Sequence, residues 1–371
     1  MMYWIPVILV LPYFFMLCRI WKNLKKIKPY NLHSGKSLFI SIIVPCRNEE
    51  SHLPFLLDDL ALQDYPGDLF EVLIVDDNST DASSEIATTH GGIKNLYVIK
   101  NSGTGKKSAI RTGVNVSSGQ LIITTDADCR MKEKWLKTID SFFSEHKPDM
   151  LIGPVQLENK SGFFGRFQEI EFLSLQGITA GTAYSENATM CNGANLSFKR
   201  ESYLIHSENM HDEITSGDDI FFLQSLKKEH RSKIMWLESV EAMVTAAAST
   251  GIKEFLYQRK RWLSKGKAYD DKYTIILAIV TFVTNMLIAA LLLASLFYPA
   301  LFIMLIAAFL IKAIPDFLIL SNTSCRYGRR SLMKWFIPGA IIYPFYVLGV
   351  AIFSLFASEE KTINSPSRKG I

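Results

Sequence analysis

The sequence predicts an α/β domain with a doubly wound sheet, joined to helices that cross a membrane. Three observations support this fold class. Short runs rich in Ile and Val alternate with stretches of helical periodicity, acidic side chains directly follow several of these runs, and four apolar stretches are long enough to span a bilayer. With 371 residues, 49% of them hydrophobic, the chain can hold both parts.

The four apolar stretches are expected to be transmembrane helices, because each has about the 20 residues that a spanning helix needs. They are Met1–Ile20, Thr274–Phe297, Pro299–Leu320 and Trp335–Phe356. The first could instead be a cleaved signal peptide, but no basic stretch precedes it and no small-residue cleavage site follows it. We therefore expect an N-terminal anchor at residues 1–21, three transmembrane helices at 274–356 and a tail at 357–371.

Basic residues at the ends of these stretches predict the orientation of the chain. They are Lys22, Lys25, Lys26 and Lys28 after the first stretch, Lys265, Lys267 and Lys272 before the second, and Arg326, Arg329, Arg330 and Lys334 before the fourth. By the positive-inside rule these clusters lie in the cytoplasm. We therefore expect a multi-pass protein of the cell inner membrane with a cytoplasmic domain at residues 33–272. Basic residues in the tail leave its side open.

The net charge of +4 comes largely from the same clusters. This distribution favours membrane lipids as a partner and argues against nucleic acid, for which a basic stripe with interleaved aromatic residues would be expected.

The region before the second apolar stretch alternates strands and helices. We expect buried strands where Ile and Val cluster, and helices where Leu or Ile recurs every three or four residues. The strands are expected at 38–44, 70–75, 96–99 and 121–125, and the helices at 53–60, 81–86, 107–116, 220–226 and 251–266. This order is typical of a doubly wound sheet.

Polar residues follow the carboxyl ends of three of these strands. They occupy residues 45–50, 76–81 and 126–128 and include several aspartates and glutamates. In doubly wound sheets, ligands bind beyond the carboxyl ends of the strands. Converging carboxylates repel one another unless a cation compensates them, and an oxygen-rich site suits Mg²⁺ or Mn²⁺. The alternative is a set of polar turns, in which aspartate is common.

Five motifs occur in a characteristic order: VPCRNE at 44–49, VDDNSTD at 75–81, TDAD at 125–128, SGDD at 216–219 and QRKRW at 258–262. Together they resemble the GT-A catalytic domain of inverting family 2 glycosyltransferases. The resemblance covers most of residues 38–265 and extends to the membrane-integrated members with a QxxRW motif, such as ceramide glucosyltransferases and hyaluronan synthases. It implies a glycosyltransferase that uses a nucleotide-sugar donor.

The resemblance implies roles for residues on the donor side. The nucleoside would be held by Pro45, Arg47, Glu49, Asp76 and Asp77, and Lys106 would line the donor pocket unless it is simply a solvated lysine at the start of a helix. Asp128 would bind the divalent metal, with Asp126 assisting or contacting the sugar nucleotide. The metal would stabilise the charge that develops on the departing nucleoside diphosphate.

The resemblance also implies the catalytic base and the acceptor side. Asp219 would take the proton from the acceptor hydroxyl, and Asp218 would tune its pKa, although both could also cap a helix. Asn192 and Gly193 resemble the acceptor-side segment, or form a plain turn. Gln258, Arg261 and Trp262 would face the diphosphate and the acceptor, or belong to a basic surface helix without catalytic duty.

These roles predict inverting transfer of a sugar, from a UDP-sugar by resemblance, to a lipid or lipid-linked acceptor at the inner membrane face. A processive polysaccharide synthase is the alternative within the same class, although four spans are few for a polymer channel. A non-catalytic membrane scaffold or transport subunit is the alternative of another class, but none of the five motifs is lost. Lys312 and Asp316, inside the third span, either line an acceptor path or neutralise each other.

Overall fold

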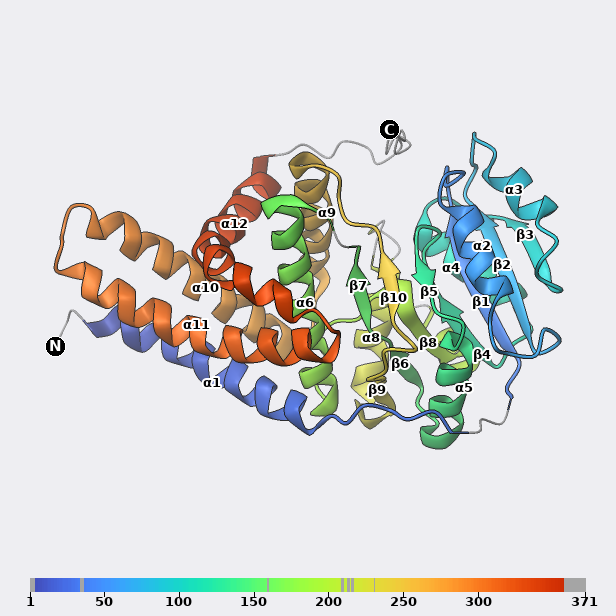
Figure 1. Cartoon of the computed structure of the whole chain (residues 1–371), viewed down its shortest axis with the longest axis horizontal. Coiled ribbons are helices and arrows are strands. Elements are labelled where there is room, and N and C mark those ends of the chain that lie inside the picture. The colour runs from blue at the N-terminus through green and yellow to red at the C-terminus, as the bar shows by residue number, and fades with distance from the viewer. Residues whose placement is uncertain are drawn as a thin grey trace. The chain divides into compact units, whose positions relative to one another are not determined.

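The computed structural model describes residues 4–33, 37–158, 160–207, 210–211, 214, 217–229 and 231–356 (Figure 1). Ser216 of the SGDD motif and the tail at 357–371 therefore lie outside the described residues. Contacts divide the chain into two units. Of the described residues, 4–27, 160–185 and 248–356 form a helical unit, and those within 28–158 and 186–247 form a sheet unit.

A seven-stranded sheet forms the centre of the sheet unit, with the order β3-β2-β1-β4-β8-β6-β9. Its first four strands are parallel and close to the predicted positions: β1 at Ile40–Cys46, β2 at Phe70–Asp76, β3 at Leu96–Lys100 and β4 at Leu121–Thr124. Strand β1 pairs with β2 on one side and with β4 on the other. The predicted α/β fold is therefore confirmed, and the strand order reverses direction between β1 and β4.

The remaining strands are short, and they make the sheet mixed rather than wholly parallel. Strand β8 (Leu196–Lys199) runs antiparallel to both β4 and β6 (Met150–Ile152), and β9 (Ile234–Trp236) is parallel to β6. A second sheet has the order β5-β10-β7, with its strands at Arg130–Met131, Val244–Ala246 and Val155–Leu157. Strands of two to four residues carry little periodicity, so their direction is set by tertiary pairing.

Six α-helices accompany these sheets. They are α2 (Leu53–Ala61), α3 (Ser83–Thr89), α4 (Lys106–Val116), α5 (Trp135–His146), α7 (Arg200–His206) and α8 (Asp218–Glu229). A single 3-10 turn at Gly193–Asn195 precedes β8, and another lies at Arg231–Lys233. Helix α4 packs closely on β1 at Gly113, where an added Cβ would lie 2.6 Å from Ile43 Cγ2. This close packing fixes the start of α4 beside the carboxyl end of β1.

The helical unit contains α1 (Ile5–Lys26), α6 (Gly162–Tyr184), α9 (Ile252–Ser264), α10 (Lys272–Ser295), α11 (Leu301–Arg326) and α12 (Phe336–Phe356). Short 3-10 turns at Lys265–Ala268 and Arg330–Trp335 connect some of them. In the described part of the chain, four helical segments are long and apolar enough to cross a membrane: Ile5–Lys26, Lys272–Ser295, Leu301–Arg326 and Arg330–Phe356. They correspond to the four predicted spans.

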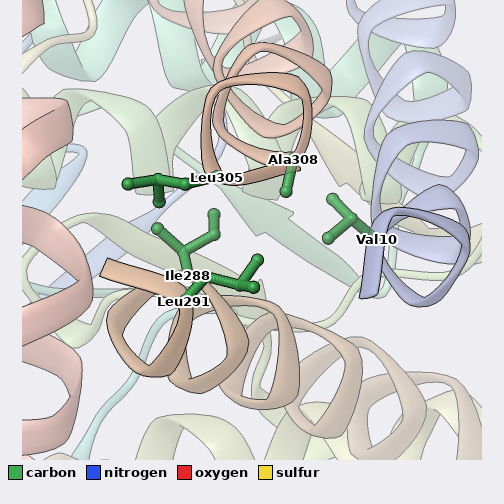
Figure 2. Close-up of a cluster of buried hydrophobic side chains, with 5 residues drawn as sticks. All are labelled: Val10, Ile288, Leu291, Leu305 and Ala308. Carbon is green, nitrogen blue, oxygen red and sulfur yellow. The ribbon is translucent and has the colours of Figure 1, made fainter. Parts of the chain in front are cut away.

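Three of the spans meet in one apolar cluster, which Figure 2 shows. Val10 of α1, Ile288 and Leu291 of α10, and Leu305 and Ala308 of α11 are all buried there. A polar contact joins the same bundle. Lys312 Nζ lies 2.8 Å from Asp316 Oδ2, and the hydroxyl of Tyr13 donates to Asp316 Oδ1 at 2.6 Å. The lysine and the aspartate therefore neutralise each other inside α11.

Helix α6 belongs to the helical unit, although residues 33–272 were expected to form one domain. It packs beside α1 and α11 (Figure 1). At Gly177 an added Cβ would lie 2.5 Å from Thr323 Oγ1, and at Gly181 it would lie 2.6 Å from the carbonyl oxygen of Ile20. Only glycine allows so close an approach at these two positions, so α6 is fitted tightly against both spans.

Candidate active site

The loops after β1, β2 and β3 meet at the carboxylate of Asp77, which is 5% exposed. Its Oδ1 accepts a hydrogen bond from Asn101 Nδ2 at 2.7 Å, and its Oδ2 accepts from the backbone N–H of Gly105 at 2.9 Å. Arg47 Nη1 lies 3.5 Å from the same Oδ2. The structure thus brings Arg47 and Asp77 together at the rim where ligands of doubly wound sheets bind.

The first two of these loops are also tied to each other. Asn48 adopts a left-handed conformation (φ 55°), and its Oδ1 accepts from the backbone N–H of Thr80 at 2.8 Å. The backbone N–H of Glu49 donates to Ser83 Oγ at 2.8 Å. The carboxylate of Glu49 lies 3.1 Å from His52 Nδ1. Asp76 ends β2, which pairs with β1, the strand that contains Pro45. Its Oδ1 accepts from the backbone N–H of Ser79 at 3.1 Å and so stabilises the turn that follows β2.

Asp126 and Asp128 form a tight turn at the end of β4. The carbonyl oxygen of Asp126 accepts from the N–H of Cys129 at 3.1 Å, and the carboxylate of Asp126 is paired with Lys106. Burial opposes the charged form of Lys106, but the negative charges of Asp126, Asp218 and Asp219 outweigh it and hold the pKa of Lys106 above its ordinary value. Lys106 is therefore engaged by carboxylates rather than by solvent alone.

The SGDD motif and the turn at Gly193 lie against this lysine. The backbone N–H of Gly193 donates to Asp219 Oδ2 at 3.3 Å. A Cβ built on Gly193 would lie 3.6 Å from Lys106 Nζ, 3.7 Å from Asp218 Oδ2 and 3.8 Å from Asp219 Cβ. The turn itself is fixed by Asn192 Oδ1, which accepts from the N–H of Ala194 at 3.0 Å. Lys106, both aspartates and the Gly193 turn thus share one small region.

Two buried asparagines support these loops. The sequence indicated no role for Asn101, and it singled out Asn195 only as the last residue of the turn at 192–195 that resembles the acceptor-side segment. Asn195 Nδ2 donates to the carbonyl oxygens of Pro154 and Ala242, both at 2.8 Å, and its Oδ1 accepts from Trp135 Nε1 at 3.1 Å. Asn101 supports Asp77 as described above. Only their positions in the sequence could have indicated a supporting role, because Asn101 directly follows β3 and Asn195 ends the turn at Gly193.

The donor set fits a divalent metal that is shared with a ligand. Among the residues that the structure describes, no group of three or more His, Cys, Asp or Glu side chains is arranged to hold a metal ion. Mg²⁺ commonly binds one or two carboxylates and completes its shell with waters and substrate phosphates. Asp126 and Asp128 are partly exposed at the end of β4 and offer such a pair of oxygen ligands.

The QRKRW motif lies on α9 of the helical unit. Arg261 is exposed, whereas Arg259 is buried and forms an ion pair with Glu171 of α6. Gln258 Oε1 accepts from Arg259 Nη1 at 2.5 Å, and the Arg259 guanidinium lies 4.1 Å from the ring centroid of Trp262. Arg259 thus contacts two of the three residues with a predicted role. That Gln258, Arg261 and Trp262 face the diphosphate or the acceptor stays a prediction.

Comparison with known proteins defines the class. Residues 41–204 match the model of the Glycosyl transferase family 2. Taken with the mixed α/β sheet and the rim just described, this match defines a glycosyltransferase domain with a GT-A-like fold. Four apolar helices accompany that domain in the same chain, as expected of a membrane protein.

Individual relatives agree with this class. The chain is 32% identical over 126 residues to Glycosyltransferase AglE of Haloferax volcanii, which covers 33% of this chain and 41% of the relative. It is 26% identical over 259 residues to the Beta-monoglucosyldiacylglycerol synthase of a Nostoc species, which covers 66% of this chain and 52% of the relative. The matched parts thus span about half the length of these curated relatives.

One solved structure is similar along nearly the whole chain. It is the mannosyltransferase PcManGT from Pyrobaculum calidifontis, determined with GDP-mannose and Mn²⁺. The TM-score is 0.53 at 17% sequence identity, and the similarity covers 95% of this chain and 96% of that chain. At this level of identity the likeness concerns the fold.

Proposed function

We propose that the chain transfers a sugar, with inversion, from a nucleotide-sugar to a lipid or lipid-linked acceptor at the cytoplasmic face of the inner membrane. The observation that carries the proposal is the convergence at Gly193. Lys106, which is bonded to Asp126 of the DxD segment, lies there beside Asp218 and Asp219. A donor-side cation and two carboxylates near one backbone turn suit a reaction in which a hydroxyl attacks a phosphate-activated sugar.

On the donor side, Asp77 and Glu49 would hold the nucleoside through their carboxylates, with Arg47, Pro45 and Asp76 shaping the same rim. Mg²⁺ or Mn²⁺ would bind Asp128, with Asp126 beside it, and would stabilise the charge on the departing diphosphate. Lys106 adds a positive charge close to Asp126, to which its ammonium group is hydrogen-bonded. By resemblance the donor is a UDP-sugar.

On the acceptor side, Asp219 would accept the proton of the acceptor hydroxyl as its oxygen attacks the anomeric carbon. The new carbon–oxygen bond forms as the bond to the diphosphate breaks, and the nucleoside diphosphate leaves with the bonding electrons. The proton ends on Asp219. Attack opposite the leaving group inverts the anomeric configuration.

A lipid acceptor is supported by two observations. Four helices of the described chain are apolar and long enough to hold the protein in a bilayer. One relative, which matches 66% of this chain, is named for the synthesis of a glycolipid, beta-monoglucosyldiacylglycerol.

The test is to purify the full chain in detergent and to supply UDP- and GDP-sugars with Mn²⁺ and a membrane lipid extract. Mass analysis of the extract should reveal a lipid heavier by one hexose or N-acetylhexosamine. Repeated additions to one product would favour a polysaccharide synthase. If no nucleotide-sugar is either transferred or hydrolysed, the enzyme proposal is wrong and a scaffold is favoured.

A further inference from the structure

Helix α4 begins with two adjacent lysines that have different partners. Lys106 is bonded to Asp126 at the donor side, as described above. Lys107 is buried, with 7% of its surface exposed, and its ammonium group donates three hydrogen bonds to backbone carbonyls. The acceptors are the carbonyl oxygens of Met210 at 2.7 Å, His211 at 2.8 Å and Ile214 at 2.8 Å.

An ammonium group has three N–H donors, and the three carbonyl oxygens lie within hydrogen-bond distance of this one. Burying a lysine charge is costly unless the charge is compensated, and three carbonyl dipoles aimed at one nitrogen contribute to that compensation. The ring of Phe221 in α8 adds a cation–π contact, with its centroid 5.1 Å from Lys107 Nζ. A buried ammonium with this many partners holds the backbone that surrounds it.

The carbonyls that Lys107 binds lie just before the proposed base. Ile214 precedes Asp218 by four residues in the sequence, and Gly217, directly before α8, has a positive φ of 101°. The carbonyl of Gly217 accepts from the N–H of Phe221 at 2.9 Å, which closes the first turn of that helix. The same residue, Phe221, receives the cation–π contact, so Lys107 touches both sides of the aspartate pair.

A second cation on α4 repeats the pattern one helical turn later. Arg111 lies four residues after Lys107 and therefore on the same face of the helix. Its Nη2 donates to the carbonyl oxygen of Ser207 at 3.4 Å, directly after α7. Between α7 and α8, the described residues Ser207, Met210, His211 and Ile214 thus each accept a hydrogen bond from α4.

We propose that Lys107 is a positioning residue for the sugar-transfer reaction. It holds the carbonyls of Met210, His211 and Ile214 so that Asp219, which follows them in the sequence, meets the N–H of Gly193 beside Lys106. Because Lys106 and Lys107 are neighbours on one helix, the donor-side carboxylate and the base are placed by the same element. This inference rests on the proposed function and adds to it a residue that lies outside the five motifs.

The kinetic test compares Lys107→Met, Lys107→Arg and the surface control Lys94→Met in the full-length protein. Lys107→Met should lower kcat for sugar transfer by about 10- to 100-fold, since a misplacement of about 1 Å can cost that much. The donor KM should stay close to the wild-type value, because the contacts of Asp77 are untouched. Lys107→Arg should recover part of the lost rate, since it keeps the charge, and Lys94→Met should behave as wild type.

A second measurement does not depend on activity. Hydrogen exchange, followed by mass spectrometry on the detergent-solubilised protein, should show faster exchange for residues 217–222 in Lys107→Met. Exchange in α5 and the affinity for UDP with Mn²⁺ should be unchanged. Unchanged exchange at 217–222, a uniform increase that includes α5, or a normal kcat would each overturn the inference. If the wild-type protein transfers no sugar, the proposed function fails, and the exchange data alone decide whether Lys107 holds this segment.

Discussion

Asp219 uses both of its carboxylate oxygens in the structure. Oδ1 accepts from the N–H of Ile220 at 2.8 Å, and Oδ2 accepts from the N–H of Gly193 at 3.3 Å. The first bond belongs to the start of α8 and the second crosses to the acceptor-side turn. Helix capping and a catalytic role were alternatives for this residue in the sequence, and one side chain in this geometry is able to serve both.

Replacing Asp219 by asparagine should separate chemistry from binding. The amide keeps the shape of the side chain but cannot accept the proton of the acceptor, so kcat should fall by roughly 10²- to 10⁴-fold. Donor affinity, measured by calorimetry with UDP and Mn²⁺, should survive. Asp218→Asn is the matched control and should lose less activity. The reverse order of the two variants would move the base to Asp218, and full activity in both would exclude the pair.

Removing Asp128, the proposed metal ligand, should act on donor binding instead. Asp128→Ala should weaken the binding of UDP in the presence of Mn²⁺, and an excess of chelator should abolish turnover of the wild-type protein, because the diphosphate charge would be uncompensated. Glu241→Ala, a substitution at a surface carboxylate paired with Lys132, provides a control. Undiminished turnover in excess chelator would rule out the metal assignment.

The sequence indicated where charged side chains would gather better than it indicated the side chains that support them. Aspartates that follow buried strands are visible as patterns, because the strand ends determine where they gather. Lys107, Asn101 and Asn195 work through hydrogen bonds to partners far away in the sequence, such as Met210 for Lys107 and Ala242 for Asn195. Which backbone carbonyl a lysine or an amide reaches depends on packing that local periodicity does not contain.

At the scale of elements, three helices of the helical unit share one buried polar contact. Arg259 of α9 and Glu171 of α6 form an ion pair, and the hydroxyl of Tyr346 in α12 donates to Glu171 Oε1 at 3.0 Å. The guanidinium also lies 4.3 Å from the ring centroid of Phe255. This contact explains why a charged residue, Arg259, lies on the buried face of the amphipathic helix α9, beside Phe255.

Substituting Arg259 alone should destabilise the protein more than substituting both partners. Arg259→Leu leaves Glu171 buried without its charge partner, at a cost of about 3–5 kcal/mol, whereas replacing a whole buried ion pair by apolar residues is often nearly neutral. In thermal unfolding of the detergent-solubilised protein, Arg259→Leu should lower Tm by several degrees, and Arg259→Leu combined with Glu171→Leu should regain part of the loss. Equal or greater destabilisation in the double variant would contradict this account.

The elements themselves were predictable where their pattern was regular, whatever their length. Strands β1 to β4 and helix α2 were expected within one or two residues of their observed limits. Helix α6 was not expected, because apolar and small residues occur all around it and 15 of its residues are buried, from Gly165 to Ala183. A helix that is enclosed on most sides has no polar face to reveal its period.

For the whole molecule, the basic ends of the spans predict which segments face the cytoplasm. Thr88 is exposed on α3 of the sheet unit, and Tyr298 is exposed between α10 and α11, at the end of α10 opposite to Lys272. In a background with all five cysteines replaced by serine, an impermeant maleimide should label Tyr298→Cys but not Thr88→Cys in right-side-out vesicles. Labelling of both should follow permeabilisation. Labelling of Thr88→Cys in sealed vesicles would overturn the cytoplasmic assignment.

The tight fit of α6 between α1 and α11 imposes an order on biosynthesis. Helix α1 is made before α6, but translation must proceed from Tyr184 to Leu301 before α11 begins to emerge. At about 5–20 residues per second this interval is on the order of ten seconds. During it, the glycine face of α6 has Ile20 of α1 available but not Thr323 or Ile319 of α11. We therefore expect the newborn chain to pass through a half-assembled stage, in which α6 packs on α1 alone until α11 has been made.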